Sequence, residues 1–277
     1  MSEAIASKFM LDGKLYDTSL FDSLYTNTFP SVYEVIRITD GVPLFLEEHF
    51  ERLSHSLESI GEKTCLSVDR LKGYIITLLK ASKVTNNNVK LVINDFKSQP
   101  GGHLYLFLIP SSYPTETMYK EGVRTSLFNA VRENPNAKII NQSLRDSVNE
   151  YLKENSLFEA ILVNKHGQIT EGSRSNIFFI KNGSVYTCPA NGVLLGVTRQ
   201  RIIHLCRQNS IEVHEEDINR DSLSQFDAAF ISGTSPKVLP IASIGEIKLD
   251  CNNECLRKIM VLYNQAVSNY IKRHSSI

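Results

Sequence analysis

Lys138 lies in a run of residues that could make its side chain a nucleophile. It follows Ala137 and precedes Ile139 and Ile140. Apolar neighbours remove water from the charged ammonium form, which favours a neutral amine able to attack a carbonyl carbon. The sequence therefore makes Lys138 a candidate catalytic residue, and a lysine without a chemical role is the alternative.

Glu171 is the candidate acid. It lies in the segment ITEGSRSN, residues 169–176, between two predicted strands. A carboxylate in such a place could keep a ring nitrogen protonated, because a nearby negative charge favours the protonated form. A salt bridge to Arg174 and an ordinary acidic turn residue are the alternatives.

His49 and Arg52 are three residues apart in a predicted helix, so they share one of its faces. A guanidinium group at the edge of an apolar stripe can bind a phosphate through its planar fork of donors. It can also cover the core with its aliphatic stem and pair with a glutamate. Taken alone, the spacing favours this second interpretation.

Two short polar turns could bind an anion. Gly196-Val197-Thr198 opens a predicted helix, and Gly233-Thr234-Ser235 follows a predicted strand. The N–H groups at a helix start attract anions, and turn N–H groups and hydroxyls can add to them. With Arg52 these groups would suffice for a phosphate monoester. Helix capping and an ordinary turn are the alternatives.

The elements that must position these residues follow from the pattern of apolar residues. Spacings of three and four predict helices at 46–60, 67–81, 141–154, 198–208 and 255–272. Apolar and β-branched runs predict strands at 32–38, 42–46, 89–94, 104–109, 123–131, 160–163, 176–180, 184–187 and 228–232. Strands and helices mix without a regular βαβ alternation, so the predicted fold class is α+β.

The apolar periodicity stops at residues 111–122, SSYPTETMYKEG, which predicts a linker. We therefore expect a small N-terminal domain at residues 1–115 and a larger C-terminal domain at residues 116–277.

Composition excludes several classes of protein. Thirty basic and thirty acidic residues give no net charge, which argues against nucleic-acid binding through bulk electrostatics. No apolar run approaches ~18 residues, so no membrane span is expected. The N-terminus has no pattern of a secretory signal, and five cysteines fit reduced thiols in the cytoplasm. Cys251 and Cys255 do not have the spacing of a metal knuckle, so no metal site is expected.

Four blocks, in this order, resemble the class IV aminotransferases. This is the pyridoxal-phosphate fold type IV family of branched-chain and D-amino acid aminotransferases and aminodeoxychorismate lyase. The blocks are VYEVIRITDGVPLFLEEHFERL (32–53), TEGSRSNIFFI (170–180), LLGVTRQRII (194–203) and FISGTSPKVLPI (230–241). The resemblance implies two α/β-type domains, most cofactor-binding residues in the larger one, and a homodimer.

The resemblance also implies roles for single residues. Lys138 matches the lysine that binds pyridoxal 5′-phosphate covalently, Glu171 the acid at its ring nitrogen, and Arg52 the arginine that grips its phosphate. The other matches are to the two phosphate loops and to positions that contact the substrate: Val197, Thr198 and Thr234, then Tyr33 and Ser235.

The activity that the resemblance implies is transfer of an amino group between a branched-chain or D-amino acid and a 2-oxo acid. A lyase that releases pyruvate from aminodeoxychorismate and a non-catalytic family member are the alternatives. One departure concerns the substrate carboxylate. Residues 92–107, VINDFKSQPGGHLYLF, contain no arginine, although related branches often place one there for this contact.

Overall fold

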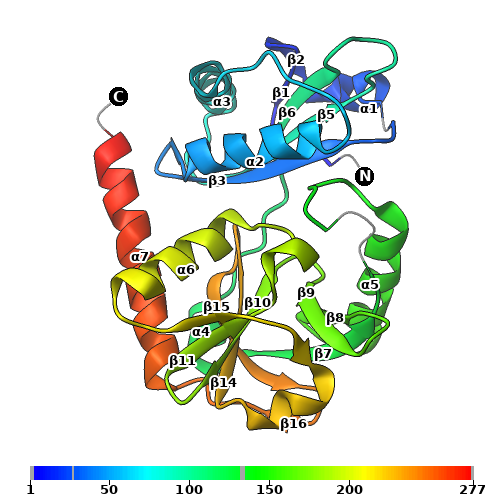
Figure 1. Ribbon diagram of the computed structural model, residues 1–277. Coiled ribbons are helices and arrows are strands. Elements are labelled where there is room, and N and C mark those ends of the chain that lie inside the picture. Colours follow the sequence, from blue (N-terminus) through cyan, green and yellow to red (C-terminus); the bar gives the residue numbers. More distant parts are fainter. Residues whose placement is uncertain (1–2, 27, 132–134, 276–277) are drawn as a thin grey trace. The chain divides into compact units, whose positions relative to one another are not determined.

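The computed structural model describes residues 3–26, 28–131 and 135–275, which divide into two compact units (Figure 1). Unit 1 comprises Met1–Ser112, Ala137–Ile140 and Val267–Ile277, and unit 2 comprises Tyr113–Asn136 and Asn141–Ala266. The chain first leaves unit 1 within the segment expected to be a linker. That segment is not irregular throughout, because it contains the short helix α4, Glu116–Glu121, whose N-cap residue Thr115 accepts a hydrogen bond from the Met118 N–H at 3.3 Å.

Unit 1 is built on a six-stranded antiparallel sheet in the order β2-β1-β6-β5-β3-β4. Its strands are β1 Lys8–Leu11, β2 Lys14–Asp17, β3 Val32–Thr39, β4 Val42–Pro43, β5 Asn87–Asn94 and β6 His103–Ile109. Its helices are η1 Thr18–Leu20, α1 Phe21–Leu24, α2 Leu46–Glu58 and α3 Val68–Ser82. The elements before Val32 were not predicted, because their short alternations carry too little apolar periodicity.

Helices α2 and α3 cover one face of this sheet (Figure 1). On α2, Leu46, Leu53 and Leu57 are buried at the spacing that predicted the helix. The predicted strand at 42–46 is wrong beyond Pro43, since Phe45 adopts a left-handed conformation with φ 55° and turns the chain into α2. A second, aromatic cluster that includes Tyr33, Tyr105 and Phe107 covers the opposite face.

Unit 2 contains a mixed sheet in the order β12-β11-β10-β14-β15-β7-β8-β9-β13, with β16 beside β15. The strands are β7 Val123–Asn129, β8 Glu159–Val163, β9 Gln168–Gly172, β10 Asn176–Lys181, β11 Ser184–Thr187, β12 Val213–Glu215, β13 Ile218–Asn219, β14 Ala228–Gly233, β15 Lys237–Ile244 and β16 Ile247–Lys248. The helices are α4 Glu116–Glu121, α5 Gln142–Glu154, η2 Ala190–Gly192, α6 Val197–Gln208, η3 Arg220–Gln225 and α7 Glu254–His274, of which the part from Val267 onward belongs to unit 1. The predicted mixture of strands and helices is confirmed.

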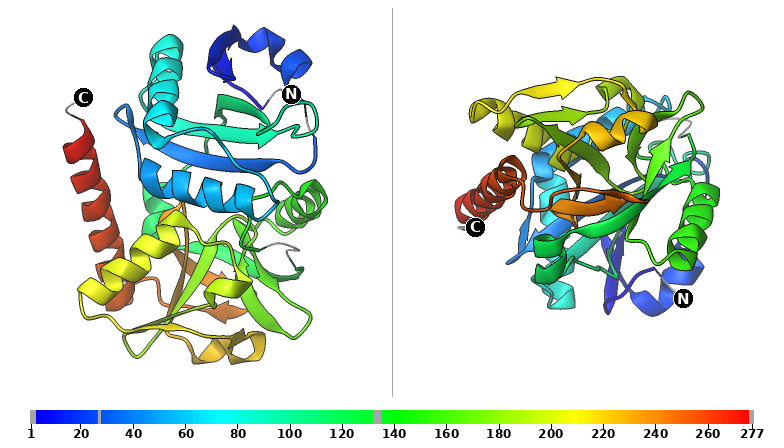
Figure 2. Two further views of the ribbon diagram at one scale, coloured as in Figure 1. Left: turned by 45° about the horizontal axis from the view of Figure 1, so that its top comes forward. Right: turned by 90° about the horizontal axis from the view of Figure 1, so that it is seen from below.

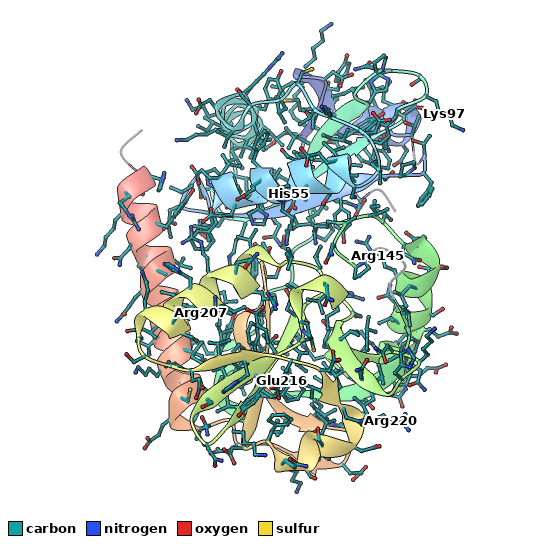
Figure 3. All side chains as sticks on the ribbon, viewed as in Figure 1. His55, Lys97, Arg145, Arg207, Glu216 and Arg220 are labelled. Atoms are coloured by element: carbon teal, nitrogen blue, oxygen red, sulfur yellow. The ribbon has the colours of Figure 1, made fainter. Side chains whose placement is uncertain are left out.

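Helix α5 packs against the β7–β8 part of this sheet through Val148 and Leu152 (Figure 2). Exposed charged side chains, such as His55 and Lys97 in unit 1 and Arg207 and Glu216 in unit 2, lie at the surface (Figure 3). Across residues 3–26, 28–131 and 135–275, no helix is both long and apolar enough to cross a bilayer.

Candidate active site

Strand β3 and helix α2 of unit 1 hold a buried group of three charged or titratable side chains. Both Glu34 carboxylate oxygens accept hydrogen bonds from Arg52, from Nε at 2.7 Å and from Nη2 at 2.7 Å. His49 Nδ1 lies 2.8 Å from Glu34 Oε2. A bidentate pair of this kind fixes the plane of the guanidinium group as well as its charge.

Burial would raise the pKa of Glu34, but the charge and hydrogen bonds of Arg52, with weaker contributions from His49, hold it well below its ordinary value. Burial lowers the pKa of His49, and the positive charges of Arg52 and Lys138 lower it further, against the opposing effect of Glu34. The group therefore consists of an ionised carboxylate, a guanidinium ion and a neutral imidazole at neutral pH.

The pairing of Arg52 with a glutamate is the structural alternative that the spacing of α2 favoured. Glu34 was not among the residues predicted for the site. Glu34 is the acidic residue of the strand VYEVIRIT, and it lies on the same side as Ile36 and Ile38. An acid on the apolar side of a predicted strand was a signal in the sequence that could have identified it. The pairing uses Nε and Nη2 of Arg52. The phosphate contact of Arg52 stays a prediction.

Lys138 is tied to unit 1 by its main chain. The Tyr33 N–H donates to the Lys138 carbonyl at 3.0 Å, and Val32 and Ile139 form an isolated antiparallel bridge. The Lys138 N–H donates to the hydroxyl of Ser56 at 3.2 Å, and that hydroxyl donates to the Arg52 carbonyl at 2.9 Å. Residues 137–140 therefore act as a short extra strand beside β3.

The Lys138 side chain is half-buried, and its Nζ lies 4.6 Å from the centre of the Tyr33 ring. An ammonium group at this distance is attracted by the ring face. The structure thus brings together Lys138 and Tyr33, which were predicted from distant parts of the sequence. Through Ser56 it also connects the main chain of Lys138 to that of Arg52.

In unit 2, Glu171 lies on β9 with 3% of its surface exposed. Its Oε2 accepts a hydrogen bond from the Leu194 N–H at 3.2 Å. Arg174, the salt-bridge partner that the sequence suggested, donates its side chain to Asn149 instead. Glu171 is therefore a buried acceptor on β9 for the main chain of Leu194, in the segment that leads to α6.

Helix α6 begins at Val197, directly after Gly196. A Cβ atom at Gly196 would lie 2.1 Å from Asn176 Oδ1, so the close approach requires glycine. Thr198 is buried, and its Oγ1 lies 3.4 Å from the hydroxyl of Tyr263 on α7. The first-turn N–H groups of this twelve-residue helix are donors without helical partners.

Thr234 and Ser235 form the turn between β14 and β15, and both are half-buried. Just before this turn, the buried hydroxyl of Ser232 has no hydrogen-bond partner among the described residues. Ser232 pairs across the sheet with Asn176. The Asn176 side chain donates to the Leu194 carbonyl at 2.8 Å.

Leu194 and Asn176 thus connect the unit 2 residues that were predicted separately. Leu194 contacts Glu171 through its N–H and Asn176 through its carbonyl, and Asn176 touches Gly196 and lies beside Ser232. Neither residue was predicted as part of the site. Both lie inside the matched blocks. For Asn176, an asparagine at the start of a buried strand was the signal in the sequence that could have identified it.

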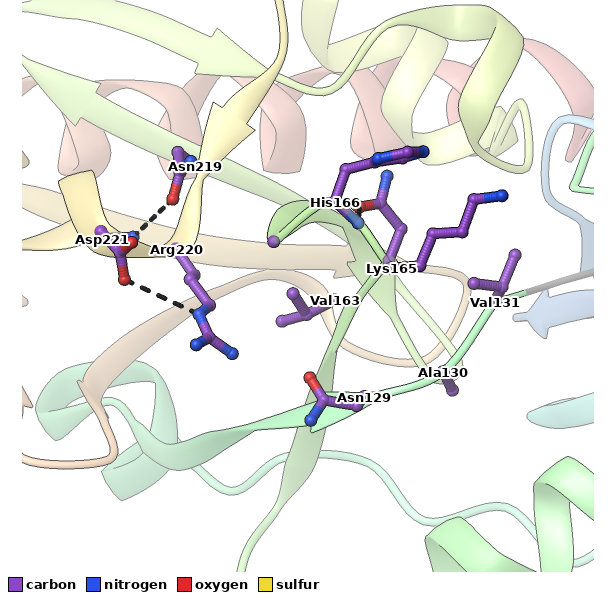
Figure 4. Close-up of a pocket in the computed structure, with 11 residues that line it drawn as sticks. Asn129, Ala130, Val131, Val163, Lys165, His166, Asn219, Arg220 and Asp221 are labelled. Carbon is purple, nitrogen blue, oxygen red and sulfur yellow. Dashed lines mark hydrogen bonds and ion pairs between the residues drawn. The ribbon is translucent and has the colours of Figure 1, made fainter.

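A separate cavity of about 630 Å³ lies in unit 2 between the end of β7, the β8–β9 turn and η3 (Figure 4). It contains Lys165 and His166 on the turn, and Arg220, whose Nε lies 3.7 Å from Asp221 Oδ1. The residues described as lining it include none of those predicted for the site.

Comparisons with known proteins identify the family of this chain. The sequence profile of the family described as "Amino-transferase class IV" matches residues 31–244. A D-alanine aminotransferase from Bacillus licheniformis is 31% identical over 222 residues, which cover 77% of this chain and 78% of the relative.

Two solved structures share the fold. A branched-chain aminotransferase from Thermoproteus uzoniensis has a TM-score of 0.81 at 24% identity, with 97% of this chain and 98% of that chain covered. The branched-chain amino acid aminotransferase of Escherichia coli has a TM-score of 0.81 at 22% identity, with 95% of each chain covered. On the profile match and the sequence relative, this chain belongs to the class IV aminotransferases, a family of enzymes that use pyridoxal phosphate.

Proposed function

We propose that this enzyme transfers an amino group between a D-amino acid or a branched-chain amino acid and a 2-oxo acid. The observation that carries the proposal is the Lys138 amine, which lies 4.6 Å from the Tyr33 ring centre on a segment fixed to β3 and to Ser56. The two substrate types are those of the D-alanine and branched-chain aminotransferases that the chain resembles.

The donor set of the described residues fits pyridoxal 5′-phosphate. The start of α6, with Val197 and Thr198, offers N–H groups and a hydroxyl to a phosphate. Thr234 offers another hydroxyl, and the unpartnered Ser232 hydroxyl lies two residues before Thr234. Glu171 supplies a carboxylate for the ring nitrogen, Lys138 an amine for the aldehyde, and Arg52 a positive charge for the phosphate.

Bound pyridoxal phosphate withdraws electrons from the substrate carbon that carries the amino group. The protein residues would then control the proton on that carbon. The Lys138 amine takes the proton as a general base and returns it as a general acid. The negative charge of Glu171 keeps the ring nitrogen protonated, which maintains the electron withdrawal. Tyr33 and Ser235 orient the substrate.

The test is a pair of half-reactions followed through the visible spectrum of the purified protein. A donor amino acid should convert bound cofactor to its amine form, and a 2-oxo acid should reverse the change. D- and L-alanine and D- and L-leucine, supplied separately, would identify the substrate type and its handedness.

Two substitutions complete the test. Lys138→Ala should lower turnover at least about a thousandfold, as expected for loss of a positioned acid–base group. Lys165→Ala, at an exposed turn, should leave turnover unchanged. Borohydride reduction followed by peptide mapping should label Lys138. Pyruvate release from aminodeoxychorismate without conversion of the cofactor would indicate the lyase instead, and a protein that never binds the cofactor would indicate a non-catalytic member.

We also propose that the enzyme is a cytoplasmic homodimer, which the family resemblance supports. Light scattering coupled to size-exclusion chromatography should give twice the chain mass of 31.2 kDa. A monomer that remains fully active would contradict the dimer.

A further inference from the structure

Lys90 is a buried cation on the sheet of unit 1. Only 4% of its side chain is exposed, and it lies on β5 between Val89 and Leu91, which face the core under α2 and α3. Alternation along the strand therefore directs Lys90 to the opposite face. There its Nζ lies 5.6 Å from the Tyr33 ring centre and 5.7 Å from that of Phe107. A lysine is rarely buried unless its charge is balanced.

The counter-charge comes from a residue near the start of the chain. Lys90 Nζ lies 2.5 Å from Glu3 Oε1, and the Glu3 side chain is 44% exposed. Two residues later, the Ile5 N–H donates to the Leu108 carbonyl at 2.9 Å, which anchors this segment to β6. Glu3 thus lies two residues before a position that is anchored to β6, and it is the exposed partner of the buried Lys90 ammonium group.

Lys90 and the proposed catalytic lysine share one aromatic ring. Lys138 Nζ lies 4.6 Å from the Tyr33 ring centre and Lys90 Nζ lies 5.6 Å from it, so the two nitrogens are no farther apart than the sum of these distances. An amino acid or 2-oxo acid carries its α-carboxylate one bond from the carbon that reacts. A substrate that reacts at Lys138 would therefore bring its α-carboxylate into the part of unit 1 that contains Lys90 Nζ.

We propose that Lys90 binds a carboxylate of the amino acid and 2-oxo acid substrates, and that Glu3 holds this position until the substrate displaces it. The inference rests on the proposed function. It assigns a cation to the substrate carboxylate in a chain whose residues 92–107 contain no arginine. The exchange replaces one carboxylate by another, so the buried ammonium group never loses its counter-charge.

Kinetics of two variants test the assignment. Lys90→Met should raise the KM for the substrates whose carboxylate Lys90 binds roughly ten- to a hundredfold, because a charge-assisted hydrogen bond is lost. Lys90→Arg should retain most of the wild-type affinity. Glu3→Gln should lower the KM a few-fold, since the competing charge is removed, whereas Asp17→Asn, in the exposed Lys8–Asp17 pair of the same unit, should not.

The choice of substrate separates the two possible carboxylates. A rise in KM for both alanine and glutamate assigns Lys90 to the α-carboxylate, and a rise for glutamate and 2-oxoglutarate alone assigns it to the side-chain carboxylate. Unchanged KM values in Lys90→Met for all four acids would overturn the proposal.

A second measurement does not depend on turnover. Glutarate, a dicarboxylate without an amino group, should accelerate hydrogen exchange at the amides of residues 4–7 in the wild-type protein but not in Lys90→Met. Equal exchange with and without glutarate would contradict the displacement of Glu3. The borohydride label at Lys138 should persist in Lys90→Met, which shows that the variant is folded. Absence of that label from the wild-type protein would reject the proposed function. The exchange experiment would still test whether Lys90 binds a carboxylate in place of Glu3, because it does not depend on turnover.

Discussion

At the scale of single residues, the charges of unit 1 depend on one buried acid. Glu34 is 1% exposed, and it holds both Arg52 and His49. Removing one partner of a buried ion pair leaves an uncompensated charge, which costs more than the pair contributes. We infer that Glu34 positions Arg52 and that this pairing keeps the guanidinium group oriented for the proposed phosphate contact.

The first prediction concerns pH. Because the pKa of His49 is lowered in the folded protein, the stability contributed by its neutral form is fully present above 6.5, the ordinary histidine value, and is lost as pH falls through the folded pKa. The lowered pKa of Glu34 acts in the same direction below 4.5. The free energy of unfolding should therefore decrease as pH falls from 7 to 5.

Denaturant unfolding of two histidine variants checks this prediction. His49→Asn keeps an amide donor for Glu34 but cannot titrate, so its stability should depend less on pH than that of the wild-type protein. His55→Asn, at an exposed position on the same helix, should follow the wild-type profile. A His49→Asn profile as steep as that of the wild-type protein would contradict the role of His49.

At the scale of secondary structure, the start of α6 is set by a close approach of backbone and side chain. Gly196 lets Asn176 come near, and Asn176 in turn holds the Leu194 carbonyl. This packing fixes where the first N–H groups of α6 point. The same packing joins Gly196, directly before α6, to Asn176 at the start of β10, twenty residues earlier in the sequence.

The second prediction follows from this packing. Gly196→Ala should displace Asn176 and turn the helix start, so that hydrogen bonds to the proposed phosphate are lost. Each such bond to a charged group is worth about 1.5–3 kcal/mol, so the dissociation constant of pyridoxal phosphate should rise about tenfold or more. Gly192→Ala is the control, because its added Cβ would meet nothing within 4 Å. Cofactor titration by absorbance measures both, and equal constants would contradict the prediction.

At the scale of the whole molecule, the chain returns to unit 1 twice after leaving it. Residues 137–140 return with Lys138, and residues 267–277 return at the end of α7. The hydroxyl of Tyr270 accepts a hydrogen bond from the Leu46 N–H at 3.3 Å and donates to Glu47 Oε2 at 2.7 Å. The end of the chain thus caps the beginning of α2, the helix that carries Arg52.

The third prediction tests this cap. Tyr270→Phe leaves the buried Leu46 N–H without its acceptor, which should lower the free energy of unfolding by about 1–3 kcal/mol. Tyr16→Phe, on the edge strand β2 of the same unit, should have a much smaller effect. Chemical denaturation followed by circular dichroism measures both variants, and similar stabilities would contradict the role of Tyr270.

Local pattern in the sequence was sufficient for the longer elements. Helices α2, α3, α5 and α6 lie within two residues of their predicted bounds at both ends, because each buries apolar residues at a helical spacing. The short strands and helices before Val32, and strands such as β9 and β15, were not predicted. The strands among them are held by pairing with other strands, as β2 pairs with β1, β9 with β8 and β15 with β14, and their short segments carry too little apolar periodicity to be predicted alone.

The family and the types of the site residues were also determined by the sequence, since the four matched blocks keep their order along the chain. Only the tertiary structure decided which groups meet: Lys138 with Tyr33, Arg52 with Glu34, Glu171 with Leu194, and Lys90 with Glu3. The physical reason is that side-chain type and spacing specify local conformation, whereas hydrogen bonds and ion pairs between distant residues form only after strand register and helix packing bring them within reach.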